Sequence, residues 1–279
     1  MEPHLDFIVK LGGSAITRKE QLECAITEHI QLVANVLSAS RQAGNTFLVV
    51  HGAGSFGHHQ AKEFGVNKGY VGCSAEKESS VKLGFCKTRL SVCKLNQLVV
   101  SEFVTAGLPA VSQSPCGVWQ TTSGQVTVDG CATVKALLLA NLVPVLHGDC
   151  VLDTTKGCNI LSGDTIITSL CAQLKPRWVV YLTDVLGIYD KPPLAPDARL
   201  LPVIRVSPDG TTDVSVSTSV VSHDVTGGIE TKLTSAIDIV LHSQGSIPVF
   251  ICAIDSPACE TTCLHGHLNN ESGTMIRML

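Results

Sequence analysis

The sequence predicts an α/β fold in which a mostly parallel central sheet carries helices on both faces, a three-layer αβα sandwich. Two observations predict it. Short apolar runs that end in glycine alternate with longer segments whose apolar residues recur at helical spacing. The 279 residues are 44% hydrophobic and 16% charged, so the chain can bury a large core and does not have the composition of a disordered one. No linker is evident, and we expect a single domain over residues 1–279.

The first elements have the order that a parallel βαβ unit requires. The runs DFIVKLGG (6–13) and TFLVVHG (46–52) are expected strands. Residues 21–37 between them predict a helix, because apolar side chains recur on one helical face at Leu22, Ile26, Ile30, Val33 and Leu37. Gly44 stands where this helix would end, since glycine readily adopts the positive φ of a helix C-terminus.

The alternation continues through the rest of the chain. Helices are expected over residues 80–107, 131–141, 163–174 and 228–245, each followed by a strand, over residues 108–113, 142–148, 177–185 and 247–253. Two segments depart from this pattern. The run TTSGQVTVDG (121–130) predicts a hairpin insertion, and residues 206–224, rich in Ser and Thr, predict a surface loop or ribbon.

Composition argues against several kinds of partner. The formal net charge of −4 gives no reason to expect nucleic acid. The N-terminus starts acidic and has too short an apolar run for a signal peptide. The most apolar stretch, VKALLLANLVPVLHG, is broken by Lys135, Asn141 and Pro144, so we expect no membrane span.

The twelve cysteines are scattered through expected helices and strands. Reduced thiols in a cytoplasmic protein are therefore favoured over disulfides. Cys259 and Cys263 are followed closely by His265 and His267, so a zinc site there is the less favoured alternative. We assign no metal-binding residue.

Six loops are expected at one edge of the sheet. Ligands of open α/β sheets bind beyond the carboxyl ends of the strands, and at that edge the chain places residues 10–14 (KLGGS), 51–59, 147–149 (HGD), 162–164 (SGD), 183–187 (TDVLG) and 224–228 (DVTGG). The last loop leads into a helix that carries Lys232. Together these loops indicate an extended site for a phosphate-rich ligand.

The stretch VVHGAGSFGHH (49–59) contains the spacing G-x-G-x-x-G. A dinucleotide turn would need an acid at the end of the next strand, but the acids at about the right distance lie in the polar run CSAEKESS. A Walker loop would need Lys-Ser/Thr after Gly57, where the chain has His-His. We therefore favour a phosphate cradle over a purely structural turn, with converging backbone N–H groups and His58 as a further donor.

Two other loops supply cations. Lys10 lies beside Gly12 and Gly13, and the glycine pair of DVTGGIETK opens a helix one turn before Lys232. The sequence offers no convincing nucleophile–base arrangement and no obvious carboxylate pair. This combination suits a reaction whose nucleophile is already ionised, such as phosphoryl transfer to a phosphate monoester.

In this order, the loops resemble those of the amino acid kinase superfamily, and within it the isopentenyl phosphate kinase family. The resemblance runs from KLGGSAITRK through VVHGAGSFGHHQA, HGDCVLD, LSGDTI and LTDVLGIY to DVTGGIETK. The segment HGAGSFGH discriminates, because acetylglutamate, aspartate and uridylate kinases lack its final histidine. Leu186 is a departure in the loop around Asp184, since many relatives have a second acid at that position.

The resemblance implies the amino acid kinase fold, with an N-terminal half that binds the phosphate acceptor and a C-terminal half that binds ATP. The implied activity is ATP-dependent phosphorylation of isopentenyl phosphate to isopentenyl diphosphate, in the alternative mevalonate route of isoprenoid biosynthesis. It also implies ATP and Mg²⁺ as cofactors, and a cytoplasmic homodimer. A kinase of another small phosphate or phosphonate, such as the fosfomycin kinases, is the alternative, and a nucleotide-binding regulatory protein without catalysis is a second.

The resemblance also implies roles for individual residues. Lys19, Lys10 and His58 would be catalytic, with Lys19 stabilising the transferring phosphoryl group. The acceptor would be held by Ala53, Gly54, His58 and Gly163. The nucleotide side would comprise Lys10, Gly12, Gly13, Ser14, Gly54, Asp164, Asp184, Gly228 and Lys232, with Asp164 orienting the lysines.

Two finer expectations concern the acceptor. Only one of two adjacent side chains can point into the cradle, so we expect His59 to be dispensable. The hydrocarbon tail is expected against the helix that follows the histidine loop, with Phe85 and Val81 as its floor. Packing of both residues in the core is the competing interpretation.

Overall fold

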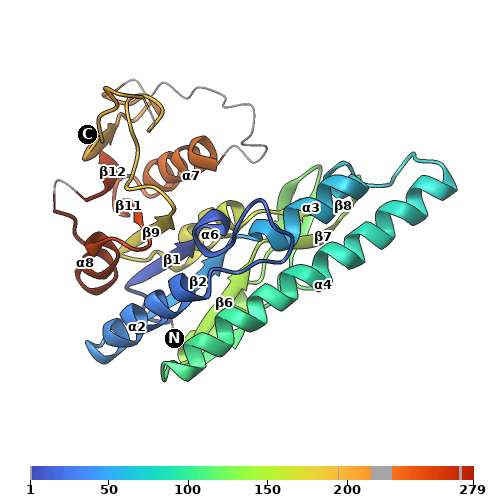
Figure 1. The fold of residues 1–279 in the computed structure, drawn as a ribbon, viewed down its shortest axis with the longest axis horizontal. Coiled ribbons are helices and arrows are strands. Elements are labelled where there is room, and N and C mark those ends of the chain that lie inside the picture. Colours follow the sequence, from blue (N-terminus) through green and yellow to red (C-terminus); the bar gives the residue numbers. More distant parts are fainter. Residues whose placement is uncertain (1, 194, 215–227, 270–271) are drawn as a thin grey trace.

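The computed structural model describes residues 2–193, 195–214, 228–269 and 272–279, and it confirms the α/β prediction (Figure 1). An eight-stranded sheet in the order β10-β12-β11-β9-β1-β2-β6-β3 forms its centre. The strands are β1 (Phe7–Leu11), β2 (Phe47–His51), β3 (Ala110–Ser112), β6 (Val143–His147), β9 (Trp178–Thr183), β10 (Val203–Val206), β11 (Val249–Ala253) and β12 (Thr274–Met278). All neighbours are parallel except β11 and β12, so six strands present their carboxyl ends at one edge.

The described helices cover both faces of this sheet. They are α1 (Gly13–Ile16), α2 (Thr27–Gln42), α3 (Gly54–Phe64), α4 (Ala75–Thr105), α5 (Cys131–Leu139), α6 (Gly163–Leu174), α7 (Gly228–His242) and α8 (Pro257–His265), with a 3₁₀ turn, η1, at Val66–Lys68. Alternate strand residues point to opposite faces, which gives two separate cores. One core lies under α2, α4 and α8, and the other under α5, α6 and α7.

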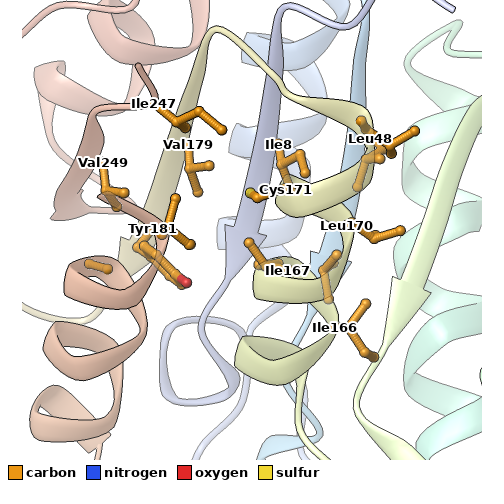
Figure 2. Packing of buried hydrophobic residues seen from close by; sticks show 14 of the residues in the cluster. Ile8, Leu48, Ile166, Ile167, Leu170, Cys171, Val179, Tyr181, Ile247 and Val249 are labelled. Carbon is orange, nitrogen blue, oxygen red and sulfur yellow. The ribbon is translucent and has the colours of Figure 1, made fainter. Parts of the chain in front are cut away.

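Figure 2 shows the second core from close by. Ile166, Ile167, Leu170 and Cys171 of α6 lie against Ile8, Leu48 and Val179 of three adjacent strands. All of these side chains are buried, and their apolar area holds α6 on the sheet. The beginning of α6 is thereby fixed beside the carboxyl ends of β1 and β2.

A second, four-stranded sheet lies beside α3 and α4, in the order β5-β4-β7-β8 (Figure 1). The hairpin predicted at residues 121–130 is confirmed as β4 (Gln120–Thr122) and β5 (Gln125–Val128). The other hairpin, β7 (Asp149–Asp153) and β8 (Gly157–Leu161), was not expected. It matters for the site because β8 leads directly into α6.

The helix expected over residues 21–37 begins only at Thr27. Residues 17–26 instead form a strap, closed by hydrogen bonds from Arg18 N to Cys24 O (2.9 Å) and from Ile26 N to Ile16 O (2.8 Å). Leu22, expected on the apolar helix face, is consequently 58% exposed. The local backbone bonds of the strap outweigh the apolar periodicity there.

The remaining expectations outside the site can be compared briefly. Residues 203–214 contain a short ribbon, with Val206 paired to Thr212, whereas residues 215–227 lie outside the described part of the chain. Cys259 and Cys263 are buried while His265 and His267 are exposed, so the four do not converge as zinc ligands. Within the described residues no helix is both long and apolar enough to cross a membrane.

Candidate active site

The loops at the carboxyl edge converge on one cavity of about 190 Å³. Four of the six predicted loops line it, through Lys10, Gly54, Gly148 and Gly163, and α7 lines it through Lys232. Lys19, on the strap after α1, also lines it. The loop 183–187 reaches the site only through Asp184, which contacts Ser14 and Lys19. The predicted loops therefore converge at this edge, and the phosphate-rich ligand stays a prediction.

Glycines allow two of these loops to touch backbone to backbone. A Cβ on Gly13 would lie 2.6 Å from Gly54 N, and a Cβ on Gly52 would lie 2.7 Å from Gly13 N. Gly54 has a φ of +50°, and its Cβ would collide with Thr17 Oγ1. The G-x-G spacing thus serves close approach of the lysine loop and the histidine loop.

The histidine loop passes straight from β2 into α3, whose first turn faces the cavity. His58 is exposed and lines the cavity. His59 does not line it, and its Nε2 donates instead to the backbone carbonyl of Lys19 at 3.1 Å. As predicted, only one of the two adjacent histidines lines the cavity. His59 bonds to the strap at Lys19, and that it is dispensable stays a prediction.

Thr17 joins the lysine loop to the same helix. Its side chain is buried; the hydroxyl donates to Gly13 O at 2.7 Å and accepts from Ser55 N at 2.9 Å. Ser55 in turn accepts a bond from Cys24 N at 3.3 Å. The strap that carries Lys19 is therefore fastened to the start of α3.

Three lysines line the cavity and differ in their environment. Lys10 is only 5% exposed, pairs with Asp164, and lies 5.4 Å above the Tyr181 ring. Lys232 is 9% exposed, and burial, assisted by the nearby charge of Lys10, lowers its pKa to about 8. The Lys19 side chain is 53% exposed, with Nζ 4.0 Å from Asp184.

Two acids orient these cations. Asp164 lies in the first turn of α6, which is capped by Ser162, and it binds Lys10. Burial works to raise the pKa of Asp184, but the hydrogen bond from Ser14 Oγ (2.9 Å) and the charge of Lys19 lower it overall. The lowered pKa keeps the Asp184 carboxylate ionised at neutral pH, so that it can hold Lys19.

The two residues expected as the floor for the hydrocarbon tail do not line the cavity, although other residues of the same helix do. Thr88 and Val92 of α4 line the cavity, with Ala61 and Ile160 opposite. Val81 belongs to a separate buried cluster, against which Phe85 packs. Thr88 and Val92 lie seven residues, about two turns, after Val81 and Phe85 and so share their helical face. The sequence indicated this face but not how far along the helix the cavity lies.

Sequence reasoning also missed the surroundings of Asp149. This buried acid accepts bonds from Arg89 Nη1 (2.9 Å) and Ser114 Oγ (2.9 Å), and it lines the cavity. Its position in the HGD loop was noted, but its partners come from α4 and from the segment after β3. Gly228 begins α7 as expected, while the preceding residues 224–227 lie outside the described part.

A buried lysine facing a glycine cradle at the edge of a parallel sheet is the arrangement of a phosphotransferase. The sequence model of the Amino acid kinase family matches residues 7–253. An isopentenyl phosphate kinase from Arabidopsis thaliana is 41% identical over 82% of either chain. One from Methanothermobacter thermautotrophicus is 34% identical over 81% of this chain and 84% of its own. The chain belongs to the amino acid kinase family, and within it to the isopentenyl phosphate kinases.

Solved structures agree with this placement. An isopentenyl phosphate kinase structure superposes with a TM-score of 0.78 at 29% identity, covering 97% of this chain and 99% of that one. The product complex of the T. acidophilum isopentenyl phosphate kinase gives a TM-score of 0.75 at 27% identity, covering 98% of this chain and 100% of that one. A UMP kinase from Ureaplasma parvum shares the fold alone, at 12% identity and a TM-score of 0.60 over 98% and 99%.

Proposed function

We propose that this protein transfers the γ-phosphoryl group of ATP to isopentenyl phosphate and releases isopentenyl diphosphate and ADP. One observation carries the proposal: a single cavity is lined by three lysines, Lys10, Lys19 and Lys232, and by the glycine cradle with His58. A group of cations suits a nucleotide triphosphate, and a glycine cradle in the same cavity suits a second phosphate. The named relatives support isopentenyl phosphate as the acceptor.

The ATP phosphates would be bound mainly by the C-terminal half of the single domain and by the first loop. Lys10 supplies an ammonium, and Gly13 and Ser14 at the start of α1 supply backbone donors. Gly12 does not line the cavity, and its N–H donates to Leu182 O at 2.8 Å, so its proposed part is to form the turn. Asp164 and Asp184 hold Lys10 and Lys19 in place, while Gly228 and Lys232 open α7. Gly54 touches this loop at Gly13 and so belongs to both halves.

The acceptor would lie in the histidine loop. Backbone N–H groups at Ala53 and Gly54, with the His58 side chain, bind its phosphate, and Gly163 bounds the site from α6. The second pKa of a phosphate monoester is near ~6, so the attacking oxygen is already ionised at neutral pH. Asp149 and Asp164, the acids along the cavity, are each paired with a cation, which agrees with a reaction that needs no general base.

Lys19 would stabilise the charge of the transferring phosphoryl group. Its side chain is the most exposed of the three lysines and is borne by the strap that joins the two halves. Such a group can approach the phosphates as they bind, and its contact grows as charge develops on the equatorial oxygens. The residue would therefore act on turnover more than on ATP binding.

Mg²⁺ fits this site as a companion of ATP. Mg²⁺ prefers substrate phosphates, water and one or two carboxylates, and the described residues contain no cluster of three or more His, Cys, Asp or Glu able to cage a metal. Asp164 and Asp184 are the carboxylates at the nucleotide side, both shared with lysines. When bound with ATP, Mg²⁺ would neutralise phosphate charge, and the protein would supply the lysines.

The test is a screen of acceptors with ATP and Mg²⁺, followed by ³¹P NMR of the products. We expect a diphosphate product from isopentenyl phosphate, with a kcat/KM far above that for fosfomycin. A preference for fosfomycin would instead support the phosphonate kinase, which the named relatives do not favour. Absence of ATP consumption with every acceptor would support a regulatory nucleotide-binding protein.

We also propose a cytoplasmic homodimer that acts in isoprenoid biosynthesis. The exposed apolar residues of α4 support self-association: Leu83, Leu90, Leu98 and Val104 recur about every two turns and share one broad face. The short edge strand β3 lies beside this helix. Light scattering after gel filtration would give the mass, and charged residues at Leu90 and Leu98 should yield monomers if this face is the interface.

A further inference from the structure

The histidine loop is flanked by two kinds of histidine, and the first, His51, lies outside the cavity. It is the last residue of β2, fully buried, and paired in register with His147 at the end of β6. The two rings stack with centroids 5.5 Å apart. Buried histidines at the ends of two central strands need a physical explanation, because the proposed reaction uses neither ring.

The hydrogen bonds of His51 fix its protonation. Nδ1 lies 3.0 Å from the carbonyl oxygen of Gly52, and since a carbonyl only accepts, Nδ1 carries the hydrogen. Nε2 accepts from Asn96 Nδ2 at 3.0 Å, and Asn96 Oδ1 accepts from Ser112. Burial, together with His147, lowers the pKa of His51 to about 3, so the ring stays neutral. His51 is thus a fixed donor aimed at one carbonyl.

That carbonyl belongs to the peptide that enters the cradle. In a trans peptide the C=O and the following N–H point in opposite directions, and none of the described residues has a cis bond. With Gly52 C=O turned down to the buried ring, Ala53 N–H is turned the other way. Both Gly52 and Ala53 line the cavity.

We propose that His51 is a positioning residue that orients the Gly52–Ala53 peptide so that Ala53 N–H donates to the acceptor phosphate. The inference rests on the proposed function for the identity of that phosphate. A glycine peptide has unusual rotational freedom, and close contact with Gly13 forbids a side chain that would restrict it. The imidazole beneath supplies the restriction from the core, through the chain Ser112–Asn96–His51 that links β3, α4 and β2.

A neighbouring loop repeats the device. His147 Nδ1 donates to the carbonyl of Gly148 at 3.1 Å, directly after β6. The stacked pair therefore fixes the first peptide after two adjacent strands, at the point where both glycines line the cavity. Because the same bond recurs at the end of the neighbouring strand, we take the bond from His51 to be a regular part of how these strands end.

The test compares two substitutions of His51. In His51→Asn the side-chain amide nitrogen takes the place of Nδ1 and keeps the donor, whereas His51→Leu removes it. We expect His51→Leu to raise the KM for isopentenyl phosphate about 10- to 100-fold with little change in the KM for ATP, and His51→Asn to recover most of the loss. Val99→Ala, buried on the same side of the sheet one turn from Asn96, controls for destabilisation.

A second readout does not depend on turnover. Gly52–Ala53 is the only Gly-Ala pair in the sequence, so ¹³C-carbonyl glycine with ¹⁵N-alanine isolates the Ala53 amide. Inorganic phosphate should shift this resonance in the wild type and in His51→Asn, but not in His51→Leu. A shift in wild type without turnover of isopentenyl phosphate would overturn the proposed function and leave the role of His51 standing.

The role of His51 would be overturned by either of two results. One is an Ala53 resonance that responds to phosphate equally in wild type and His51→Leu. The other is equal loss in His51→Asn and His51→Leu with a rise in the KM for ATP, because that pattern, if shared by Val99→Ala, marks general loosening of the core.

Discussion

Replacing Thr17 with valine tests whether the lysine loop and the histidine loop are held at a set distance. Valine keeps the branched shape and removes only the hydroxyl, which donates to Gly13 O at 2.7 Å and accepts from Ser55 N at 2.9 Å. Thr17 contacts neither proposed substrate, since it does not line the cavity. Any effect on turnover must therefore pass through the backbone.

The magnitude follows from what the hydroxyl leaves behind. Ser55 is buried, so its N–H would be left without an acceptor when the Thr17 hydroxyl is removed. A buried donor without a partner lowers the free energy of unfolding by about 1–3 kcal/mol. Gly13 O loses one donor at the loop that approaches Gly54 most closely. A shift of about 1 Å between the loops can cost about 10²-fold in turnover when reacting groups must align.

Two measurements separate the effects. Urea unfolding should show Thr17→Val destabilised by about 1–3 kcal/mol, and steady-state kinetics should show a fall in kcat larger than the rise in either KM. Thr17→Ser keeps the hydroxyl and should restore kcat. If Thr17→Val unfolds like the wild type and turns over normally, or if Thr17→Ser is as slow as Thr17→Val, the hydroxyl does not set the distance.

The other predictions concern groups at the cavity. His58→Ala should lower kcat/KM for isopentenyl phosphate by about 1.5–3 kcal/mol while ATP affinity, measured by calorimetry, stays near that of wild type; equal loss of both would contradict the acceptor role. Lys19→Ala should lower kcat by about 10²-fold or more with a small change in the KM for ATP, and Lys19→Arg should recover part of it; a change in KM alone would place the stabiliser elsewhere. The pKa of Lys232 is lowered to about 8, so its charge is present below that pH and lost above it, and kcat/KM for ATP should fall as pH rises through 8, a limb that Lys232→Arg should remove. Val92 lines the cavity, so Val92→Ala should favour longer prenyl monophosphates over isopentenyl phosphate by up to about 0.8 kcal/mol per CH₂ newly buried. Phe85 packs against a separate buried cluster, so Phe85→Ala should leave that ratio unchanged. The opposite ranking would show that Phe85 and not Val92 limits the length of the tail.

The sheet and most of the helices could be predicted because their signals are local. Alternation of apolar strands with amphipathic helices depends on residues close in sequence, and glycine marks many of the junctions. The same local view failed at residues 17–26, where Leu22 continues the helical spacing by coincidence. There the backbone closes on itself and is fastened to Ser55, a partner too distant in sequence for periodicity to reveal.

The unexpected hairpin β7–β8 has a similar cause. Its turn is organised by Asp153, which accepts bonds from Thr155 N and Lys156 N nearby, but also from Thr121 Oγ1 and Gly124 N of the other hairpin. The bonds that stabilise the turn thus join segments about 30 residues apart, and neither segment contains a local pattern that predicts this contact. Sequence reasoning identified the loops on either side without the strands between them.

For the site, the sequence predicted the residue types and the edge of the sheet at which they lie, but it did not predict the direction in which each side chain points. Lysines and glycines at strand ends indicate phosphate wherever their loops converge, and the cavity unites Lys10, Lys19 and Lys232 as expected. Which of His51, His58 and His59 faces the ligand depends on where β2 ends and α3 begins. That boundary places His51 in the core and His58 at the cavity, and it directs the His59 ring to the strap at Lys19.

When a reaction needs no general base, its rate depends mainly on how closely the enzyme holds the two reacting phosphates. The acceptor phosphate brings its own negative charge, so the enzyme gains rate by holding two anions together against their repulsion and by neutralising the group in transit. In the proposed mechanism the cations neutralise the transferring group, and holding the two anions together depends on the two glycine loops, which touch at Gly13 and Gly54. Glycine loops cannot stiffen themselves, and their rigidity comes from buried polar side chains beneath and beside them, above all Thr17 and His51. Substitutions that touch neither substrate should for this reason rank among the slowest variants of the enzyme.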